Sequence, residues 1–556
     1  MSEAQAEPGL STGKRGGMPP ILASAGVAAW LVLIDNVSFW RTFIGAQDGA
    51  LLSKIALALS VALVLIAVLT TACRLIATPR AGVAVFALLL IVSAGVAHYL
   101  DRWGVLFDKG LIRNIVETDV REARELLSWP AFIDVALRGL LPAALLWWVG
   151  IRRSSAPNAL LQTGGVALCA ATLGASVIFL FYGDLATTFR NHRELRFQLV
   201  PTNYFNAVYG FLKGTDTKPR SLAAVGSDAR RTRIDAPRPR VLVLVVDETA
   251  RASNFSLGGY QRETNLALKG KEIVYFSNVS SCGTDTATSL PCMFSDLGMS
   301  RFSLDAGHAR ENLLDVLVRA GVTVTWLDNN SGCKGVCARV RTEQMPTSGD
   351  PKLCMDGSCQ DEILVPALDQ LLANVRDDST IVLHKMGSHG PSYFRRYPAP
   401  GRFQPTCDTN RVQTCTREQL VNTYDNSIDY TSRVVAMVLD AARARAAELD
   451  IAVLYVSDHG ESLGENNIYL HGLPRLLAPP EQTAIPMMAW LSAGASRSLP
   501  LRPQCLAAVS GKAFSHDNLF HTVLGYHAID TSAYRPDLDI FSIARSIPGC
   551  EGNQDR

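Results

Sequence analysis

The sequence has little net charge, no repeats and no regular cysteine pairs. Its 53 Lys and Arg residues are balanced by 51 Asp and Glu residues, so the formal net charge is only +2 over 556 residues. Without a dominant basic stripe, the chain is not a general nucleic-acid binder, and we expect no nucleic-acid partner. It has no internal repeat or low-complexity tract, and it lacks the regular CxxC pairs of zinc knuckles. At this length more than one domain is expected.

Up to about Gly183 the chain is a series of long apolar stretches, and after it the composition is that of a soluble protein. Most of these stretches approach the ~20 residues that a helix needs to cross a bilayer. The first is short and ends at Asp35. Because it lacks a small-residue cleavage site, we interpret it as a retained helix and not as a signal peptide. The predicted membrane spans are residues 21–34, 55–72, 81–97, 131–149 and 160–181.

Basic residues in the short loops predict the orientation of these spans. By the positive-inside rule, loops that carry Lys and Arg face the cytoplasm. These residues are Lys14 and Arg15 before the first span, Arg74 and Arg80 between the second and third, and Arg152 and Arg153 between the fourth and fifth. Five spans that start inside leave everything after Gly183 outside. We therefore expect a multi-pass protein of the bacterial inner membrane whose soluble part lies in the periplasm.

Cysteine usage agrees with this location. Of 12 Cys, only Cys73 and Cys169 lie in the membrane part. An even number of closely spaced cysteines in a domain already placed outside indicates disulfides. Spacing leaves the connectivity open, and the simplest arrangement pairs neighbours: Cys282 with Cys292, Cys333 with Cys337, Cys354 with Cys359, Cys407 with Cys415, and Cys505 with Cys550.

The composition predicts three regions: a transmembrane domain over residues 1–183, a bridging region over 184–238 and a soluble domain over 239–556. In the bridging region, residues 190–196 and 204–212 have the pattern of short amphipathic helices that lie at a membrane surface. Residues 213–239 are rich in Gly, Ser, Pro and Arg, which indicates a flexible linker.

The soluble domain alternates predicted strands with predicted helices. Strands are expected at 240–246, 322–327, 380–385 and 451–457, and helices at 313–320, 362–375 and 426–447. Such alternation is typical of an α/β domain with a mostly parallel sheet between helices.

Metal-binding side chains directly follow three of these strands. Asp247 and Glu248 follow the first, His389 follows the strand at 380–385, and Asp458 and His459 follow the last. Groups just past the carboxyl ends of parallel strands converge on one crevice. Asp, Glu and His are ligands for a borderline-soft divalent ion, and zinc is the first choice.

A metal site that performs chemistry also needs a nucleophile, and residues 281–292 offer several hydroxyls. Gly283 permits a tight turn, and Ser or Thr at the start of a helix presents a hydroxyl beside free backbone N–H groups that bind phosphate. Coordination to zinc would stabilise a threonine alkoxide, and Thr284 and Thr286 are both candidates. The alternative for a lone threonine is an ordinary helix cap.

Four motifs resemble a known family. They are Asp247-Glu-Thr-Ala-Arg-Ala-Ser-Asn-Phe-Ser256, Cys282-Gly-Thr-Asp-Thr-Ala-Thr-Ser-Leu-Pro-Cys-Met-Phe-Ser295, Met386-Gly-Ser-His-Gly-Pro391 and Ser457-Asp-His-Gly-Glu-Ser-Leu-Gly-Glu465. In these motifs and their order the chain resembles, over essentially its whole length, the phosphoethanolamine transferases that modify lipid A. These include the transferases behind polymyxin resistance. The resemblance implies a five-helix transmembrane domain and a periplasmic domain of the alkaline phosphatase/sulfatase-like fold.

The resemblance also assigns roles to individual residues. It implies one tightly bound Zn²⁺, with room for a second, and it selects Thr286 over Thr284 as nucleophile. The implied zinc ligands are Glu248, Thr286, Asp458 and His459. His389 and His471 match residues that bind the substrate phosphate or a second zinc, and Asn330 and Lys334 match polar residues that line the substrate site. The tight Cys333/Cys337 pair beside Lys334 departs from the commonest family pattern.

The loop between the third and fourth spans carries a further signal. Asn114, Thr118 and Glu122 recur every four residues and therefore share one helix face. The family places its donor-lipid headgroup contacts here, and a carboxylate suits the ammonium of ethanolamine. The alternative is a solvated helix face.

The resemblance implies a two-step transfer from phosphatidylethanolamine to a phosphate of lipid A. A zinc-activated threonine would carry the phosphoethanolamine as a covalent intermediate, in a monomeric membrane enzyme. Close alternatives are transfer to a core sugar or a glucan, and transfer of phosphoglycerol. A sulfatase is disfavoured because it needs a modifiable Cys or Ser at the position of Thr286. A silent membrane scaffold is disfavoured by the intact set of Glu248, Thr286, Asp458 and His459.

Overall fold

The computed structural model describes residues 17–47, 50–117, 127–192, 194–214, 222–232, 237–345, 350, 352–355 and 358–550. Its contacts divide the chain into two compact units. The membrane unit comprises Met1–Phe107 and Ser128–Asn206, and the catalytic unit comprises Asp108–Leu127 and Ala207–Arg556. The domain boundaries at residues 183 and 238 stay predictions.

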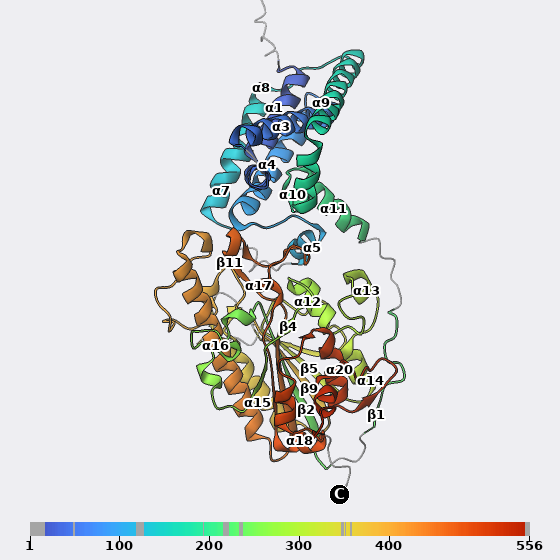
Figure 1. Cartoon of the computed structure of the whole chain (residues 1–556), viewed down its shortest axis with the longest axis vertical. Coiled ribbons are helices and arrows are strands. Elements are labelled where there is room, and N and C mark those ends of the chain that lie inside the picture. Colours follow the sequence, from blue (N-terminus) through green and yellow to red (C-terminus); the bar gives the residue numbers. More distant parts are fainter. Residues whose placement is uncertain are drawn as a thin grey trace, which may run out of the picture. The chain divides into compact units, whose positions relative to one another are not determined.

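The membrane unit is built from long apolar helices (Figure 1). Within the described residues, four helices are long and apolar enough to cross a bilayer: α3 (Leu51–Ile76), α4 (Ala81–Trp103), the run Trp129–Val149 and the first part of α9 (Ala156–Asn191). The run Trp129–Val149 comprises α7 (Trp129–Val135), a π-helical turn (Ala136–Leu140) and α8 (Leu141–Val149). The outward side chains are apolar, including Leu52 at 80% and Phe179 at 86% exposure, as expected for a lipid-facing surface.

The first predicted span is a bent pair of helices. The chain bends by 58° between α1 (Pro20–Ile34) and α2 (Val37–Gly45), and together the two helices have the length of one span. Asn36 at the bend donates hydrogen bonds of 2.8 Å to the carbonyls of Leu31 and Val200. The side-chain amide thus binds backbone carbonyls at the point where the helix is interrupted. Counting this pair as one span gives the five that the sequence predicts.

The bridging region differs in detail from its prediction. α9 continues to Asn191, α10 covers only Leu195–Gln198, and α11 (Thr202–Gly214) replaces the helix predicted at 204–212. Part of the predicted linker is ordered: β1 (Arg230–Arg231) pairs with β15 (Ile529–Asp530), and Asp228 accepts a 2.6 Å hydrogen bond from Thr531. Composition alone missed these contacts because their partners lie 300 residues away in the sequence.

The catalytic unit contains a seven-stranded sheet with the order β3-β13-β10-β2-β9-β5-β6. Four of its six neighbouring pairs are parallel, and the two that involve β13 are antiparallel. The α/β class with a mostly parallel sheet is therefore confirmed. The strands are β2 (Arg240–Asp247), β3 (Val274–Phe276), β5 (Thr323–Asp328), β6 (Arg341–Gln344), β9 (Ser379–His384), β10 (Asp450–Ser457) and β13 (Met487–Leu491).

Helices cover both faces of this sheet (Figure 1). Leu242, Leu244 and Val246 of β2 belong to the main apolar core on one face, to which α12 (Thr286–Met293), α14 (Leu313–Arg319), α20 (Asp517–Tyr526) and α21 (Ile540–Arg545) contribute. α15 (Leu364–Asn374) and α16 (Arg417–Ala444) lie together on the opposite side. α16 begins earlier than predicted because Thr416 and Gln419 form a capping box.

The remaining regular elements are short. They are α5 (Lys109–Glu117), α13 (Leu304–His308), α17 (Pro480–Thr483), α18 (Ala493–Ser498), α19 (Pro503–Ala508), β4 (Val279–Ser280), β7 (Cys354–Met355), β8 (Ser358–Cys359), β11 (Ser462–Leu463), β12 (Tyr469–Leu470) and β14 (Phe514–Ser515).

All five disulfides join the neighbouring cysteines that the simplest arrangement pairs. They are Cys282–Cys292, Cys333–Cys337, Cys354–Cys359, Cys407–Cys415 and Cys505–Cys550. Four of them close loops of ten residues or fewer, whereas Cys505–Cys550 spans 45 residues. A longer loop removes more entropy from the unfolded chain.

This difference predicts unequal contributions to stability. Replacing both Cys505 and Cys550 with Ser should lower the free energy of unfolding by about 4 kcal/mol, and replacing both Cys333 and Cys337 by about 2 kcal/mol, in the chain-entropy model. Urea unfolding of the full-length protein in detergent measures both values. Equal losses would show that loop entropy does not govern them.

Candidate functional site

The carboxyl ends of β2 and β10 bring three predicted metal ligands together. Glu248 directly follows β2, and Asp458 and His459 directly follow β10. The strands pair in parallel with Ser457 opposite Asp247, so their ends lie level. One ligand atom from each of the three side chains lies within 4.8 Å of the other two, and each residue is at most 1% exposed.

The donor atoms of this cluster fit a metal ion. His459 Nδ1 lies 2.9 Å from the Gly460 carbonyl, to which it donates, and Nε2 points into the cluster, 3.2 Å from Glu248 Oε1 and 3.4 Å from Asp458 Oδ2. Asp458 Oδ1 accepts from the backbone N–H groups of Thr249 and His459 at 3.0 and 2.7 Å. Its Oδ2 is buried and has no hydrogen-bond partner within the described ranges. Two carboxylates and an imidazole at one buried point suit zinc.

The electrostatics of the cluster are those of a site with excess negative charge. Burial and the neighbouring Glu248 carboxylate raise the pKa of Asp458 to about 8. Burial alone would lower the pKa of His459, but the carboxylates of Asp458 and Glu248 raise it to about 10. A divalent cation bound here would take the place of these protons, because it would neutralise the same carboxylates of Asp458 and Glu248.

The loop that starts at Cys282 brings Thr286, the predicted nucleophile, to this cluster. Thr286 is the first residue of α12, and Asp285 caps the helix by accepting from the Thr288 N–H at 2.9 Å, so Thr286 is not the cap. Its Oγ1 lies 2.9 and 3.0 Å from the two oxygens of Glu248 and 3.4 Å from His459 Nε2. Thr284, in contrast, donates its hydroxyl proton to the Leu473 carbonyl at 2.6 Å. Of the two candidates, only Thr286 contacts the cluster.

His389 and His471 lie next to the cluster. The ring centroid of His471 is 4.4 Å from that of His459 and 5.6 Å from that of His389. His471 Nδ1 lies 3.2 Å from Glu461 Oε2. His389 comes from the turn after β9, where Gly387 has a φ of +56° and a Cβ would collide with the Glu248 carbonyl. The turn therefore passes directly over the metal ligand.

Asn330 contacts the predicted metal ligand Glu248. It is 2% exposed, and its Nδ2 donates to Glu248 Oε2 at 3.0 Å and to the Lys385 carbonyl at 2.9 Å. The sequence predicted that Asn330 lines the substrate site. That role stays a prediction, and the hydrogen bond from its amide nitrogen would also orient Glu248 as a metal ligand.

Lys334 lines a separate cavity of about 590 Å³ beside α12. Arg310 and Arg339 also line it, but Arg310 lies 2.6 Å from Asp296 and Arg339 lies 2.5 Å from Asp315. The Lys334 ammonium lies 3.5 Å from the Ser331 hydroxyl. Ser331 follows Asn330 in sequence, so the loop that supports Glu248 also carries the charge in this cavity.

Asn114 lies on α5, which packs against α12 within the catalytic unit. Arg113 of the same helix lies 3.5 Å from Asp305 at the start of α13. Thr118 and Glu122 lie outside the described residues. The helix that begins with Thr286, the predicted nucleophile, thus has the predicted donor segment as its neighbour.

Two buried supports escaped the sequence reasoning. Lys385, 1% exposed, lies 2.8 Å from Asp247 Oδ1 and donates to Thr431, while the Tyr455 hydroxyl donates to Asp247 Oδ2. Glu461, fully buried, contacts His471. Glu461 belongs to the motif that begins at Ser457, and its position two residues after His459 could have identified it as part of the site.

Comparison with known proteins agrees with this site. A model described as "Sulfatase" matches residues 240–528, and one described as "Phosphoethanolamine transferase EptA/EptB" matches residues 25–215. The chain is 36% identical over 536 residues to phosphoethanolamine transferase EptA of Escherichia coli K12, with 94% of this chain and 98% of that protein covered. The chain belongs to the phosphoethanolamine transferase family.

Two further members of the family extend the comparison. The chain is 34% identical to phosphatidylethanolamine transferase Mcr-1 of Escherichia coli, with 86% of this chain and 90% of that protein covered. The solved structure of the integral membrane protein lipooligosaccharide phosphoethanolamine transferase A from Neisseria meningitidis superimposes with a TM-score of 0.91 at 34% identity, covering 95% of this chain and 98% of that one. This phosphoethanolamine transferase is accordingly an integral inner-membrane enzyme with a periplasmic, alkaline phosphatase-like domain.

The contact between Asn330 and Glu248 predicts an effect on zinc affinity. Asn330→Leu removes the hydrogen bond that orients Glu248, and loss of such a support typically weakens metal binding by about 10- to 100-fold. Competition with a chromophoric chelator measures the change. Asn426→Leu is the control, because Asn426 is equally buried but bonds to Phe403. An equal loss in both variants would assign the effect to general destabilisation.

The buried pair of His384 and Asp328, 3.1 Å apart, predicts a pH dependence of stability. Burial alone would lower the pKa of His384, but Asp328 raises it above 6.5. A raised histidine pKa stabilises the fold fully below pH 6.5 and progressively less as the pH rises through the folded value. Burial opposes but does not prevent the lowering of the Asp328 pKa by His384, so the carboxylate keeps its contribution down to acidic pH.

The free energy of unfolding should therefore differ most between wild type and His384→Gln near pH 6 and least near pH 9. Urea unfolding of both proteins at these two pH values measures the difference. A difference that does not change with pH would mean that the pair is not charged.

Proposed function

We propose that this enzyme transfers phosphoethanolamine from phosphatidylethanolamine to a phosphate of lipid A through a covalent intermediate on Thr286. One observation carries the proposal: the Thr286 hydroxyl lies within 3.0 Å of both Glu248 oxygens, at the start of α12 and beside Asp458 and His459. A hydroxyl in contact with a carboxylate cluster at a helix N-terminus combines a nucleophile with a place for phosphate.

Glu248, Asp458 and His459, together with Thr286, would hold one tightly bound Zn²⁺. When bound, the ion supplies Lewis-acid chemistry that lowers the pKa of the nucleophilic hydroxyl and offsets charge on the transferred phosphoryl group. His389 and His471 offer two further nitrogen atoms for the substrate phosphate or for a second ion. Asn330 keeps Glu248 oriented throughout.

The reaction has two balanced halves. In the first, the Thr286 oxygen forms a bond to phosphorus and gives its proton to water, and the bond from phosphorus to the diacylglycerol oxygen breaks. His389 or His471 gives that oxygen a proton, so diacylglycerol departs as a neutral alcohol, and water returns a proton to the histidine. In the second, an oxygen of a lipid A phosphate forms a bond to the same phosphorus, the bond from phosphorus to the Thr286 oxygen breaks, and this oxygen takes a proton from water.

The nature of the substrates explains the architecture. Both are membrane lipids, so an enzyme that binds them is expected to have membrane spans. Asn114, and the predicted contacts Thr118 and Glu122, would hold the ethanolamine headgroup near α12, and Lys334 would attract the acceptor phosphate. The names of the relatives, a phosphatidylethanolamine transferase and a lipooligosaccharide phosphoethanolamine transferase, support this donor and this class of acceptor.

The product carries an added ammonium group, which lowers the negative charge of the outer surface. Cationic peptides such as polymyxin are then attracted less strongly. We propose polymyxin resistance as the cellular consequence and a monomer as the working form.

Mass spectrometry tests the proposal. Cells that express the wild type should contain lipid A heavier by one phosphoethanolamine group, and Thr286→Ala should abolish this species. The Thr286 hydroxyl contacts both Glu248 oxygens and is half-buried, whereas the Thr249 hydroxyl, which contacts Glu248 Oε1, is fully buried. Thr286→Ser, which keeps the hydroxyl, is the matched variant and should retain measurable transfer.

Intact-mass spectra of the purified protein separate the alternatives. Phosphoethanolamine on Thr286 with unmodified lipid A would keep the donor half and assign another acceptor, such as a core sugar or a glucan. A phosphoglycerol adduct would change the donor. Wild-type protein that carries no adduct beyond its sequence mass, together with unmodified lipid A, would refute the function.

A further inference from the structure

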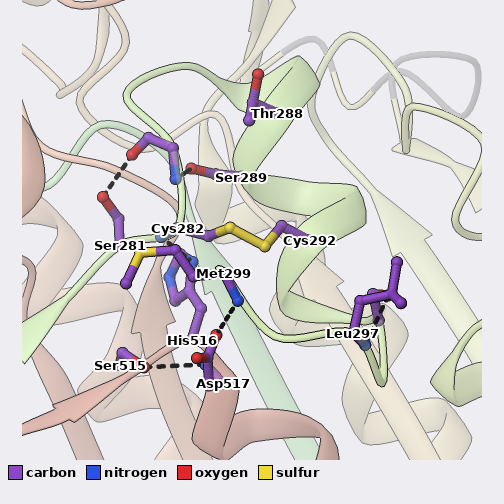
Figure 2. The surroundings of a disulfide bond; sticks show 12 residues. Ser281, Cys282, Thr288, Ser289, Cys292, Leu297, Met299, Ser515, His516 and Asp517 are labelled. Carbon is purple, nitrogen blue, oxygen red and sulfur yellow. Dashed lines mark hydrogen bonds between the residues drawn. A yellow bond between two sulfur atoms is a disulfide. The ribbon is translucent and has the colours of Figure 1, made fainter. Parts of the chain in front are cut away.

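His516 lies buried between the nucleophile loop and the strand that carries two metal ligands. It is 2% exposed and stands at the start of α20, directly after β14. Figure 2 shows it beside the Cys282–Cys292 disulfide. β14 pairs in parallel with β4, and the His516 N–H donates to the Ser280 carbonyl at 3.2 Å, which fixes the backbone of His516 against the start of the loop.

Both ring nitrogens of His516 bond to backbone groups. Nδ1 lies 3.1 Å from the Cys282 nitrogen and accepts its N–H, and Nε2 lies 2.9 Å from the Ser457 carbonyl and donates to it. Since a backbone N–H only donates and a carbonyl only accepts, the ring must be neutral with its proton on Nε2. Burial lowers the pKa of His516 to about 4, which agrees with a neutral ring.

These two backbone groups belong to the two halves of the site. Ser457 immediately precedes Asp458 and His459, and Cys282 begins the loop that leads through Gly283, Thr284 and Asp285 to Thr286. The disulfide connects Cys282 to Cys292 in α12, the helix that Thr286 opens. A displacement of Cys282 relative to Ser457 therefore moves Thr286 relative to Asp458 and His459.

We propose that His516 is a positioning residue that sets the place of Thr286 relative to Glu248, Asp458 and His459. It acts through the hydrogen bonds to Cys282 and Ser457 and does not touch the reacting atoms. This inference rests on the proposed roles of Thr286 and the three ligands. It goes beyond the transfer reaction because it names one neutral imidazole as the group that fixes the loop of Thr286 against the end of β10.

Other contacts of the loop explain why this link matters. Ser281 donates its N–H to the Thr483 carbonyl at 2.8 Å, Arg475 donates to the Ser281 carbonyl at 2.6 Å, and Gly283 donates to Ser289 at 3.0 Å. These bonds join the loop to segments outside β10 or to α12 itself. His516 connects the loop directly to the end of β10, where a shift of a few tenths of an ångström reaches two metal ligands.

Three substitutions separate the two hydrogen bonds. His516→Asn places an acceptor near the position of Nδ1 and keeps the bond to Cys282, but it is too short to reach Ser457. His516→Gln places a donor near Nε2 and keeps the bond to Ser457 alone. His516→Leu removes both. His521→Leu is the matched control, because His521 lies on the same helix, is 3% exposed and bonds to the Arg535 N–H at 3.2 Å, away from the loop.

The full-length protein in detergent is tested in two ways. The first is the visible spectrum of the cobalt(II)-substituted protein, which reports whether the Thr286 oxygen lies in the coordination sphere and needs no turnover. The second is release of diacylglycerol from phosphatidylethanolamine labelled in its acyl chain. His516→Leu should change the cobalt spectrum and lower kcat by about tenfold or more, the effect of displacing a reacting group, with KM unchanged. His516→Asn and His516→Gln should fall between it and wild type, and His521→Leu should match wild type.

Each outcome decides the proposal. A wild-type cobalt spectrum and kcat in His516→Leu would overturn it, and so would equal effects of His516→Leu and His521→Leu. If His516→Leu does not fold, the Asn and Gln variants decide, and wild-type spectra and kcat in both would overturn the proposal. If the wild type releases no diacylglycerol while the cobalt spectrum still changes with His516 and not with His521, the positioning role stands and the proposed donor is wrong.

Discussion

The burial of two carboxylates at neighbouring strand ends is the constraint on which the catalytic unit depends. Glu248 and Asp458 are at most 1% exposed and close enough to share one ion. Removing such charges from water is costly unless cations and hydrogen-bond donors replace the lost solvent. Most of the polar contacts around the site supply these donors: Thr249 and Asn330 to Glu248, the backbone N–H groups of Thr249 and His459 to Asp458, and the His459 ring between the two.

The sheet makes this arrangement rigid. β2 and β10 are neighbours along their whole length and fully buried, so their ends cannot shift independently. One residue below Glu248, Asp247 forms a buried ion pair with Lys385 from the end of β9, which fastens a third strand to the same level. The proposed metal ligands thus directly follow strands that ladder hydrogen bonds hold in place, whereas the proposed nucleophile Thr286 lies at the end of a loop and needs other contacts to fix its position.

The sequence predicted the strands and the cluster of Glu248, Asp458 and His459 because both have local signals. A run such as Val241–Val246 is continuously apolar since the strand is buried on both faces, and Glu248 stands directly after it. The choice of Thr286 over Thr284 came only from the family resemblance, since the deciding contact, Thr284 to Leu473, joins residues 189 positions apart. The support of Glu248 by Asn330 and the placement of His516 were beyond local patterns for the same reason. The bend at Asn36 escaped prediction because its partner Val200 is equally remote.

The separation of ligands and nucleophile has a chemical reason. In the proposed reaction the nucleophile meets two substrates in turn and needs access to both, and Thr286 is half-buried while the three proposed ligands are fully buried. A loop and a short helix provide that access, but their position is soft compared with that of a central strand. Three contacts fix the start of the loop and do not involve Thr286 at its end. They are the disulfide to Cys292, the hydrogen bond from Arg475 to Ser281 and the hydrogen bonds of His516. Because a backbone displacement of about 1 Å is enough to disrupt a reacting geometry, the residues beneath Cys282 matter for the reaction as the ligands do, although none of them meets the substrate.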